Sequence, residues 1–242
     1  MTTPAPPTPH VPAPRSGDEP TRISRYRTFT RAVLTKCESD PGARSALRSG
    51  VRKDLDSVPR MHRVIAHLVP QNASEDTQRA YYAVAAMIAE QARRGGDAAD
   101  AVDTAAMHEA AQAAEPAAAA KESDKERDYG TSLGTAFAMA VVRSPGHERT
   151  MRRGTAESRL NLLCKQGVTG LHRHLPASVR YLRSLNVPVD WARLLQDFTD
   201  WRRHSGRITR SWLQDFYRLL QEEERERRNV ADAQASSPDA EG

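Results

Sequence analysis

One short stretch of the sequence matches a catalytic motif. Gly130 to Gly134 read Gly-Thr-Ser-Leu-Gly, the G-x-S-x-G pattern with which many hydrolases expose a nucleophilic serine on a sharp turn. That turn requires a buried strand immediately before it, whereas the preceding residues here, Lys121–Asp128, are almost all charged. We therefore expect Ser132 to cap a helix, and we expect that the chain is not an enzyme.

The histidines and cysteines do not form a recognisable metal or nucleophile site. His172 and His174 are separated by one residue, so on a helix they point apart, and no Cys, Asp or Glu stands beside them at ligand spacing. We expect them to be an exposed pair on a basic surface. Cys164 falls on the apolar stripe of a helix and is expected to be a buried structural thiol. The sequence predicts neither a metal site nor a cofactor.

Arginine is the residue type whose distribution indicates a function. Residues 128–220 carry 15 Lys and Arg against 7 Asp and Glu, a net charge of +8, and all but one of these cations is arginine. Because the planar guanidinium pairs well with phosphate, a helical surface of this composition favours a polyanion as partner. Phosphate contacts fix position rather than sequence and weaken with salt. The nucleic-acid-binding candidates are Arg44, Arg48, Arg52, Lys53, Arg143, Arg149, Arg152, Arg153, Arg159, Arg202 and Arg203.

The composition changes along the chain and marks five segments. Residues 1–20 contain seven prolines and are expected to be a disordered arm. Basic blocks at 21–95 and 129–221 are each expected to form a small helical bundle. Between them, 96–128 is an alanine-rich, acidic stretch that we interpret as a linker or insertion, and 222–242 is expected to be a charged, mostly disordered tail.

The spacing of apolar residues predicts an all-α fold. Apolar residues recur at helical spacing through both basic blocks, and no stretch alternates with the period of a strand. Ser74, followed by two acidic residues, predicts a helix start. Asp190 is expected to cap a later helix, and after a break at Ser205-Gly206 a last helix is expected to be capped by Thr209.

Two tryptophans offer flat rings on which bases could stack. Trp191 shares the helical stripe of Leu194, Leu195 and Phe198, so we expect it to pack in the core. Trp201 stands at the end of that stripe, and its role stays open.

The sequence favours a cytoplasmic protein. Cys37 and Cys164 are the only cysteines, which gives no disulfide framework and fits a reducing compartment. No apolar run approaches the ~20 residues needed to span a bilayer, and the first residues lack the apolar core of a signal peptide. We expect no membrane contact.

The order of short motifs in the second block resembles a known family. Residues 130–138 read Gly-Thr-Ser-Leu-Gly-Thr-Ala-Phe-Ala, and a basic turn at Arg149–Arg153 follows. Arg159 opens the run Arg-Leu-Asn-Leu-Leu, and 187–198 read Val-Pro-Val-Asp-Trp-Ala-Arg-Leu-Leu-Gln-Asp-Phe. The series closes with Trp-Leu-Gln-Asp-Phe-Tyr from Trp212. It is similar to the small subunit of the type I-E CRISPR interference complex Cascade, the CasB family.

The first block fits the same family. Gly42-Ala-Arg-Ser-Ala-Leu-Arg48 and the helix at Arg63–Pro70 resemble its early segments. The resemblance covers roughly 22–95 and 129–220, so the arm, the insertion and the tail fall outside it.

The resemblance implies an all-helical, non-catalytic subunit of an antiviral ribonucleoprotein. Its implied partners are the backbone and large Cascade subunits, a second copy of itself, the CRISPR RNA and the target DNA. In such complexes base pairing reads sequence while protein cations hold backbones. The implied role is to stabilise the R-loop of guide RNA, target strand and displaced strand, with basic contacts around Arg48–Lys53 and Arg143–Arg159.

The alternative is a free-standing helical DNA-binding regulator. It would need a helix-turn-helix whose second helix reaches base edges. The only candidate is the helix pair predicted at Val187–Leu220, whose joint is apolar and rich in tryptophan.

Overall fold

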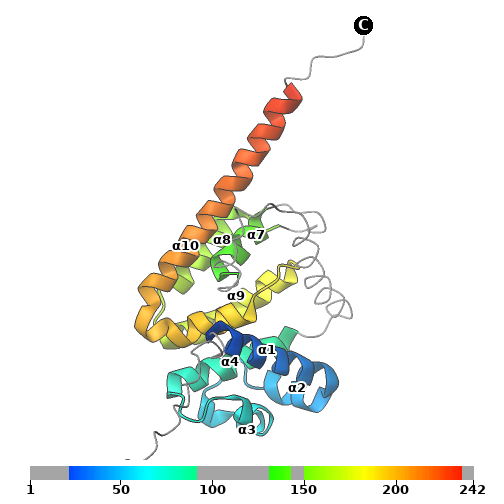
Figure 1. Cartoon of the computed structure of the whole chain (residues 1–242), viewed down its shortest axis with the longest axis vertical. Helices are drawn as coiled ribbons and strands as arrows, with labels where there is room; N and C mark the ends of the chain where they lie inside the picture. The colour runs from blue at the N-terminus through cyan, green and yellow to red at the C-terminus, as the bar shows by residue number, and fades with distance from the viewer. Residues whose placement is uncertain (1–21, 92–130, 143–149, 236–242) are drawn as a thin grey trace, which may run out of the picture.

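The described part of the chain is built from helices. The computed structural model describes residues 22–91, 131–142 and 150–235, and within these ranges it contains eight α-helices, two short 3₁₀ turns and no strand (Figure 1). The expected all-α fold is confirmed. None of these helices combines the length and apolarity needed to cross a membrane. The arm at 1–20 and the linker at 96–128 lie outside the described residues.

Capping side chains explain where the helices of the first half begin. The Asp40 carboxylate accepts a hydrogen bond from the Ala43 amide (2.9 Å). Ser74 Oγ accepts one from the Thr77 amide (3.3 Å), which confirms Ser74 as a cap. The α-helices of this half are α1 (Arg22–Ser39), α2 (Pro41–Arg48), α3 (Pro59–Ile65) and α4 (Glu75–Gln91). The 3₁₀ turns are η1 (Leu55–Ser57) and η2 (Ala66–Leu68).

The second half also contains four helices. Ser132 caps the first of them, and Pro176 lies inside the third without ending it. The Asp190 carboxylate accepts the Arg193 amide (2.9 Å) and so caps the last one, as expected. The helices are α7 (Leu133–Val141), α8 (Arg153–Cys164), α9 (Val168–Ser184) and α10 (Trp191–Ala235).

Helix α10 consists of two helical parts that meet at a sharp kink. The break expected at Ser205-Gly206 is found one residue earlier, because the backbone leaves helical geometry at His204 (φ −132°, ψ 22°) and a second helical part begins directly after it. Thr209 therefore lies inside a helix and does not cap one. Figure 1 shows the resulting bend, after which the helix rises away from the body. The helix pair expected at 187–220 is present as the two parts of α10, and Trp201 packs against Trp212 at its joint.

The end of α10 corrects a second expectation. Residues 222–235 belong to the helix instead of a disordered tail, and only 236–242 lie outside the described residues. Glu223 pairs with Arg227 one turn later (3.0 Å), the spacing and order that stabilise an exposed helix. Arg153 of α8 also reaches Glu224 (2.7 Å). Glu, Arg and Ala are strong helix formers, and they make up most of residues 222–235, so the helix extends through this stretch.

The two halves share one hydrophobic core. Helices α1 and α4 pack against α10, and α4 also packs against α9, so buried residues of both halves form one cluster. In the first half the ring of Phe29 meets that of Tyr81 edge-on, with centroids 4.6 Å apart. The Tyr26 hydroxyl then contacts Thr199 Oγ1 of α10 (2.9 Å). The two expected bundles are therefore joined by direct packing as well as by the linker.

Helices α7 and α10 approach each other at a glycine. A Cβ built on Gly134 would overlap the backbone carbonyl of Trp212, so only glycine fits at this crossing. This explains the second glycine of the G-x-S-x-G match by packing.

Candidate nucleic-acid interface

Ser132 is a helix cap, as expected. Its Oγ accepts a hydrogen bond from the Thr135 amide (3.2 Å) and lies 3.2 Å from Thr135 Oγ1. The side chain is buried, with 5% of the residue exposed. These contacts satisfy an amide that would otherwise lack a partner at the start of α7.

His172 is not the exposed surface residue that the sequence predicts. Its ring lies against Phe198 of α10 (4.3 Å between centroids), and its Nε2 is buried without a hydrogen-bond partner. Burial, together with the nearby Arg79 guanidinium, lowers the pKa of His172 to about 4. His172 therefore packs against an apolar neighbour and is not solvated as expected. Across the described ranges, no three His, Cys, Asp or Glu side chains converge as metal ligands.

The two thiols sit in low-polarity surroundings. Cys37 is buried in α1 and Cys164 is half-buried at the end of α8. Burial raises the pKa of each thiol to about 11, so both are protonated at neutral pH.

Three of the four expected cations of the first half lie in solvent around the end of α2. Arg48, Arg52 and Lys53 are exposed and form no ion pair with any described residue. Arg44 differs, because its Nε donates to the carbonyl of Ala89 (3.2 Å) at the C-terminal end of α4. A cation there satisfies the open carbonyls of a helix end. Arg44 is therefore a half-buried structural residue whose guanidinium is held by this hydrogen bond.

Arg52 has an unusual backbone. Its φ is 62°, in the left-handed region that costs non-glycine residues about 1–2 kcal/mol. Asn186, after α9, has φ 59°, but asparagine adopts this region readily. Arg52 is thus an exposed cation at a position where backbone conformation alone would favour glycine or asparagine.

The cluster expected at Arg143–Arg159 is only partly described, because Arg143 and Arg149 lie outside the described residues. Arg152 is exposed and unpaired within the described chain. Arg153 pairs with Glu157 (3.2 Å) and with Glu224 (2.7 Å), which links α8 to α10. The Arg159 guanidinium lies over the ring of Tyr181 (4.5 Å), a cation–π contact. These last two are held by protein partners, so they are weaker candidates for phosphate.

Helix α10 carries a further exposed basic stretch around its bend. Arg202 pairs with Asp76 of α4, which ties the bend to the first half. Arg203 is exposed, and so are Arg207 and Arg210, and none of these three pairs with a described residue.

Trp191 and Trp201 both pack in or against the core, and Trp201 is the more deeply buried of the two. Trp201 is buried, with 1% exposed, and its Nε1 donates to the Gln166 carbonyl (3.0 Å). Trp191 is half-buried and packs against the hydrophobic core, as expected. Trp201 meets Trp212 across the kink at His204, with ring centroids 5.1 Å apart.

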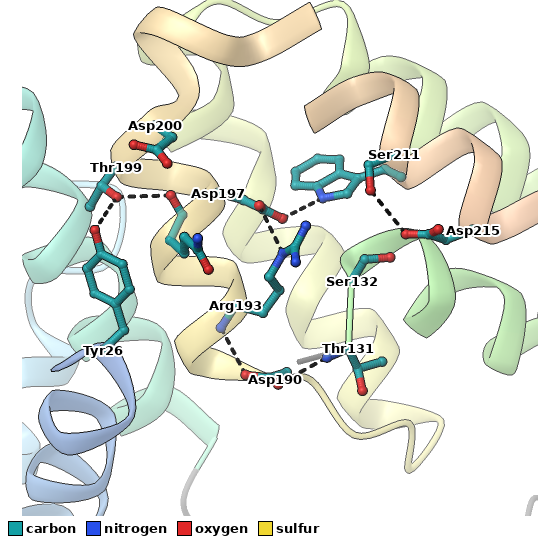
Figure 2. Close-up of polar contacts among 12 residues, drawn as sticks. Tyr26, Thr131, Ser132, Asp190, Arg193, Asp197, Thr199, Asp200, Ser211 and Asp215 are labelled. Atoms are coloured by element: carbon teal, nitrogen blue, oxygen red, sulfur yellow. Dashed lines mark hydrogen bonds and ion pairs between the residues drawn. The ribbon is translucent and has the colours of Figure 1, made fainter. Parts of the chain in front are cut away.

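A buried polar network along α10 was not predicted from the sequence. Asp197 accepts a hydrogen bond from Arg193 Nε (3.1 Å) and another from Trp212 Nε1 (2.7 Å), as Figure 2 shows. Burial raises the pKa of Asp197 to about 6, while both donors act in the opposite direction. The signal was an aspartate on the apolar side of α10, four residues after an arginine.

A second set of polar contacts joins the halves. The Arg22 guanidinium binds the Asp200 carboxylate with both nitrogens, Nη2 to Oδ1 at 2.6 Å and Nη1 to Oδ2 at 3.1 Å. In Figure 2 Asp200 lies on the same turn of α10 as Thr199, the partner of Tyr26. These contacts position α10 and are not themselves an interface.

An all-helical body with separate groups of exposed, unpaired arginines defines a class of helical protein suited to polyanions. The chain belongs to the family described as CRISPR-associated protein Cse2, which matches residues 43–217. This is the CasB family that the order of motifs resembles.

Solved structures agree with the family. A chain of a CRISPR RNA-guided surveillance complex in a pre-nicking state is 31% identical, with a TM-score of 0.62, covering 84% of this chain and 98% of the other. A chain of a second CRISPR RNA-guided surveillance complex is also 31% identical, with a TM-score of 0.62 and coverage of 85% and 98%. M. ruber CasB, at 19% identity, TM-score 0.57 and coverage of 84% and 97%, shares the fold. No curated protein matches the chain.

Proposed function

We propose that this chain is the non-catalytic small subunit of a type I-E CRISPR surveillance complex. In this role it assembles with the backbone and large subunits and with a second copy of itself. It stabilises the R-loop formed by CRISPR RNA, target strand and displaced strand through contacts with nucleic-acid backbones, and so supports antiviral defence. Membership of the Cse2 family and the likeness to chains of surveillance complexes support the assembly.

The proposed backbone contacts rest on a set of exposed cations that pair with no acidic side chain among the described residues. Around the end of α2 and the start of α3 these are Arg48, Arg52, Lys53, Arg60 and Arg63. Unpaired guanidinium groups keep all their donors available for phosphate oxygens. In Arg153 and Arg202, by contrast, some of the donors are occupied by ion pairs with Glu224 and Asp76.

Sequence independence follows from where these side chains stand. They lie on short helices and a turn instead of along one helix that could enter a major groove. Contacts of this kind hold a strand in place without reading its bases, and base pairing with the guide supplies the specificity.

The test compares two variants with the same change of net charge in the reconstituted complex. The first, R48Q/K53Q/R60Q, removes three unpaired cations beside α2 and α3. The control, R225Q/R227Q/R228Q, removes three cations from the end of α10. Dissociation of target DNA is measured over a range of salt concentrations after equal incorporation of each variant has been verified.

We expect the first variant to lose target faster and to show a weaker salt dependence. Each lost phosphate contact should lower the log–log salt slope by about 0.7–0.9, so the slope should fall by about 2–3. The control should stay near the wild type. Equal behaviour of the two variants would mean that only the total charge matters, and unchanged retention in both would contradict the proposed contacts.

A further inference from the structure

The outer face of α10 beyond its bend carries a shallow groove that neither the fold nor the proposed backbone contacts explain. It has a volume of about 500 Å³ and is lined along four turns of the one helix. Its lining includes Gly206, Arg210, Leu213, Tyr217, Arg218 and Gln221. An aromatic residue, an aliphatic residue and two arginines therefore share this side of the helix.

Tyr217 is the feature of the groove that stands out. Trp212, Phe216 and Leu220 repeat every four residues and are buried, whereas Tyr217, beside that stripe, is 37% exposed. Its ring is held edge-on against Phe216, with centroids 5.1 Å apart and planes at 75°. A large ring in a fixed orientation offers a flat surface at little entropic cost.

The charge of the groove selects an anionic occupant. Arg210 and Arg218 line it, are exposed, and form no ion pair with described residues. No Asp or Glu lines the groove. Leu213 is half-buried beneath them and gives the groove an apolar floor. Cations around an aromatic ring with an apolar floor fit an unpaired nucleotide, which has a phosphate and a base face.

Gly206 opens one end of the groove. It lies in α10 two residues after the kink at His204. A Cβ added there would meet no atom within 4 Å, so packing within the protein does not require glycine. The missing side chain leaves the helix backbone accessible to whatever occupies the groove.

We infer that this groove binds single-stranded nucleic acid, with a base stacked on Tyr217 and the adjoining phosphates on Arg210 and Arg218. The inference rests on the proposed function and extends it, because it assigns the displaced strand of the R-loop to α10. Stacking on a tyrosine tolerates any base, so the contact stays independent of sequence.

The test uses the reconstituted complex bound to two targets that differ only in the displaced strand. One displaced strand carries its bases, and the other is abasic over the protospacer, so it keeps every phosphate but offers nothing to stack. Tyr217→Leu removes the ring, and Tyr217→Phe keeps it. Leu162→Ala is the matched control, since Leu162 is an exposed apolar residue (45%) on α8 and does not line the groove.

We expect Tyr217→Leu to speed target dissociation about tenfold when the displaced strand carries bases, and to have no effect on the abasic target. Tyr217→Phe should recover most of the retention that Tyr217→Leu loses, and Leu162→Ala should match the wild type on both targets. An equal effect of Tyr217→Leu on both targets, or none on either, would overturn the inference. So would failure of that variant to enter the complex, which would mark the groove as a protein contact.

The two proposals fail in different ways. If Tyr217→Leu has no effect while R48Q/K53Q/R60Q still loses target, only the stacking site is wrong. If the charge variant also retains target normally, the backbone contacts are wrong too.

Discussion

The indole N–H of Trp212 donates a 2.7 Å hydrogen bond to the Asp197 carboxylate, and the two residues lie on opposite sides of the bend at His204. The ring of Trp212 also meets that of Trp201 across the same bend. Since Asp197 is buried and also binds Arg193, these contacts fix the angle between the two parts of α10. The bend is thus held by side chains and does not depend on a flexible turn.

Asp197→Ala should destabilise the fold strongly. It leaves the Arg193 guanidinium and the Trp212 N–H without their shared acceptor, and removing one partner of a buried ion pair costs about 3–5 kcal/mol. Asp215→Ala is the control, because Asp215 is half-buried and accepts only a 3.3 Å bond from Ser211. The free energy of unfolding in urea measures both. A loss for Asp197→Ala no larger than for the control would mean that the network does not hold the bend.

Gly134→Ala tests the crossing of α7 and α10. The added methyl group overlaps the Trp212 carbonyl, a backbone atom that cannot move without displacing α10, so we expect a loss of about 1–3 kcal/mol or more. Gly154→Ala in α8 meets open space and should raise stability by about 0.5–1 kcal/mol. Thermal unfolding of the two variants should shift in opposite directions. A neutral Gly134→Ala would contradict the tight crossing.

Arg52→Gly should separate stability from function. Glycine adopts a φ of 62° without strain, so the free energy of unfolding should stay level or rise by up to about 1 kcal/mol. Retention of target DNA should nevertheless fall, because an unpaired cation is lost. Asn186→Gly, at φ 59°, is the conformational control and should leave target retention unchanged. Unchanged retention in Arg52→Gly would remove Arg52 from the interface.

His172 should make the protein less stable in acid. Its folded pKa is about 4, below the unfolded value of 6.5, so the unfolded chain takes up the proton first as the pH falls. The stability it contributes is complete above pH ~6.5 and is lost toward pH ~4. His172→Phe should therefore gain about 2 kcal/mol relative to the wild type at pH 5 compared with pH 7.5. A pH-independent difference would show that His172 titrates normally.

Asp197 should act in the opposite sense over nearly the same pH range. Its folded pKa of about 6 lies above the unfolded value of 3.8, so the native state takes up the proton first, and stability rises as pH falls from about 6 to about 4. Asp197→Asn should remove this gain, so its stability should fall more steeply in acid than that of the wild type. The same urea titrations at several pH values measure it, and parallel curves would contradict the raised pKa.

The sequence predicts those parts of the fold that depend on local chemistry. Ser74, Ser132 and Asp190 are followed by helices that they cap, because capping needs only one side chain and a nearby amide. The apolar spacing likewise predicts α1 and α4, whose buried faces meet the rest of the core.

The features that the sequence did not predict depend on contacts between residues on different elements or on different parts of one helix. The sequence indicates a break near Gly206, but it does not indicate the contact between Trp201 and Trp212 across the kink at His204. From the sequence Arg44 is expected to be a surface cation, but in the structure it donates a hydrogen bond to the end of α4. From the sequence His172 is expected on an exposed basic surface, but in the structure its ring packs against Phe198. In each case the partner is remote in sequence, so spacing along one helix carries no signal for it.

The shared core has a consequence for how the chain would hold a long polyanion. Since α10 packs on α7 as well as on α1 and α4, the cations near Arg52 and those near Arg203 cannot move independently. A strand engaged at one group meets the other at a fixed, high effective concentration, so individually weak contacts add up to avidity. The strand then dissociates only when its contacts with both groups are broken at the same time. Slow dissociation would therefore depend on the fixed spacing of the two groups and not on any single arginine.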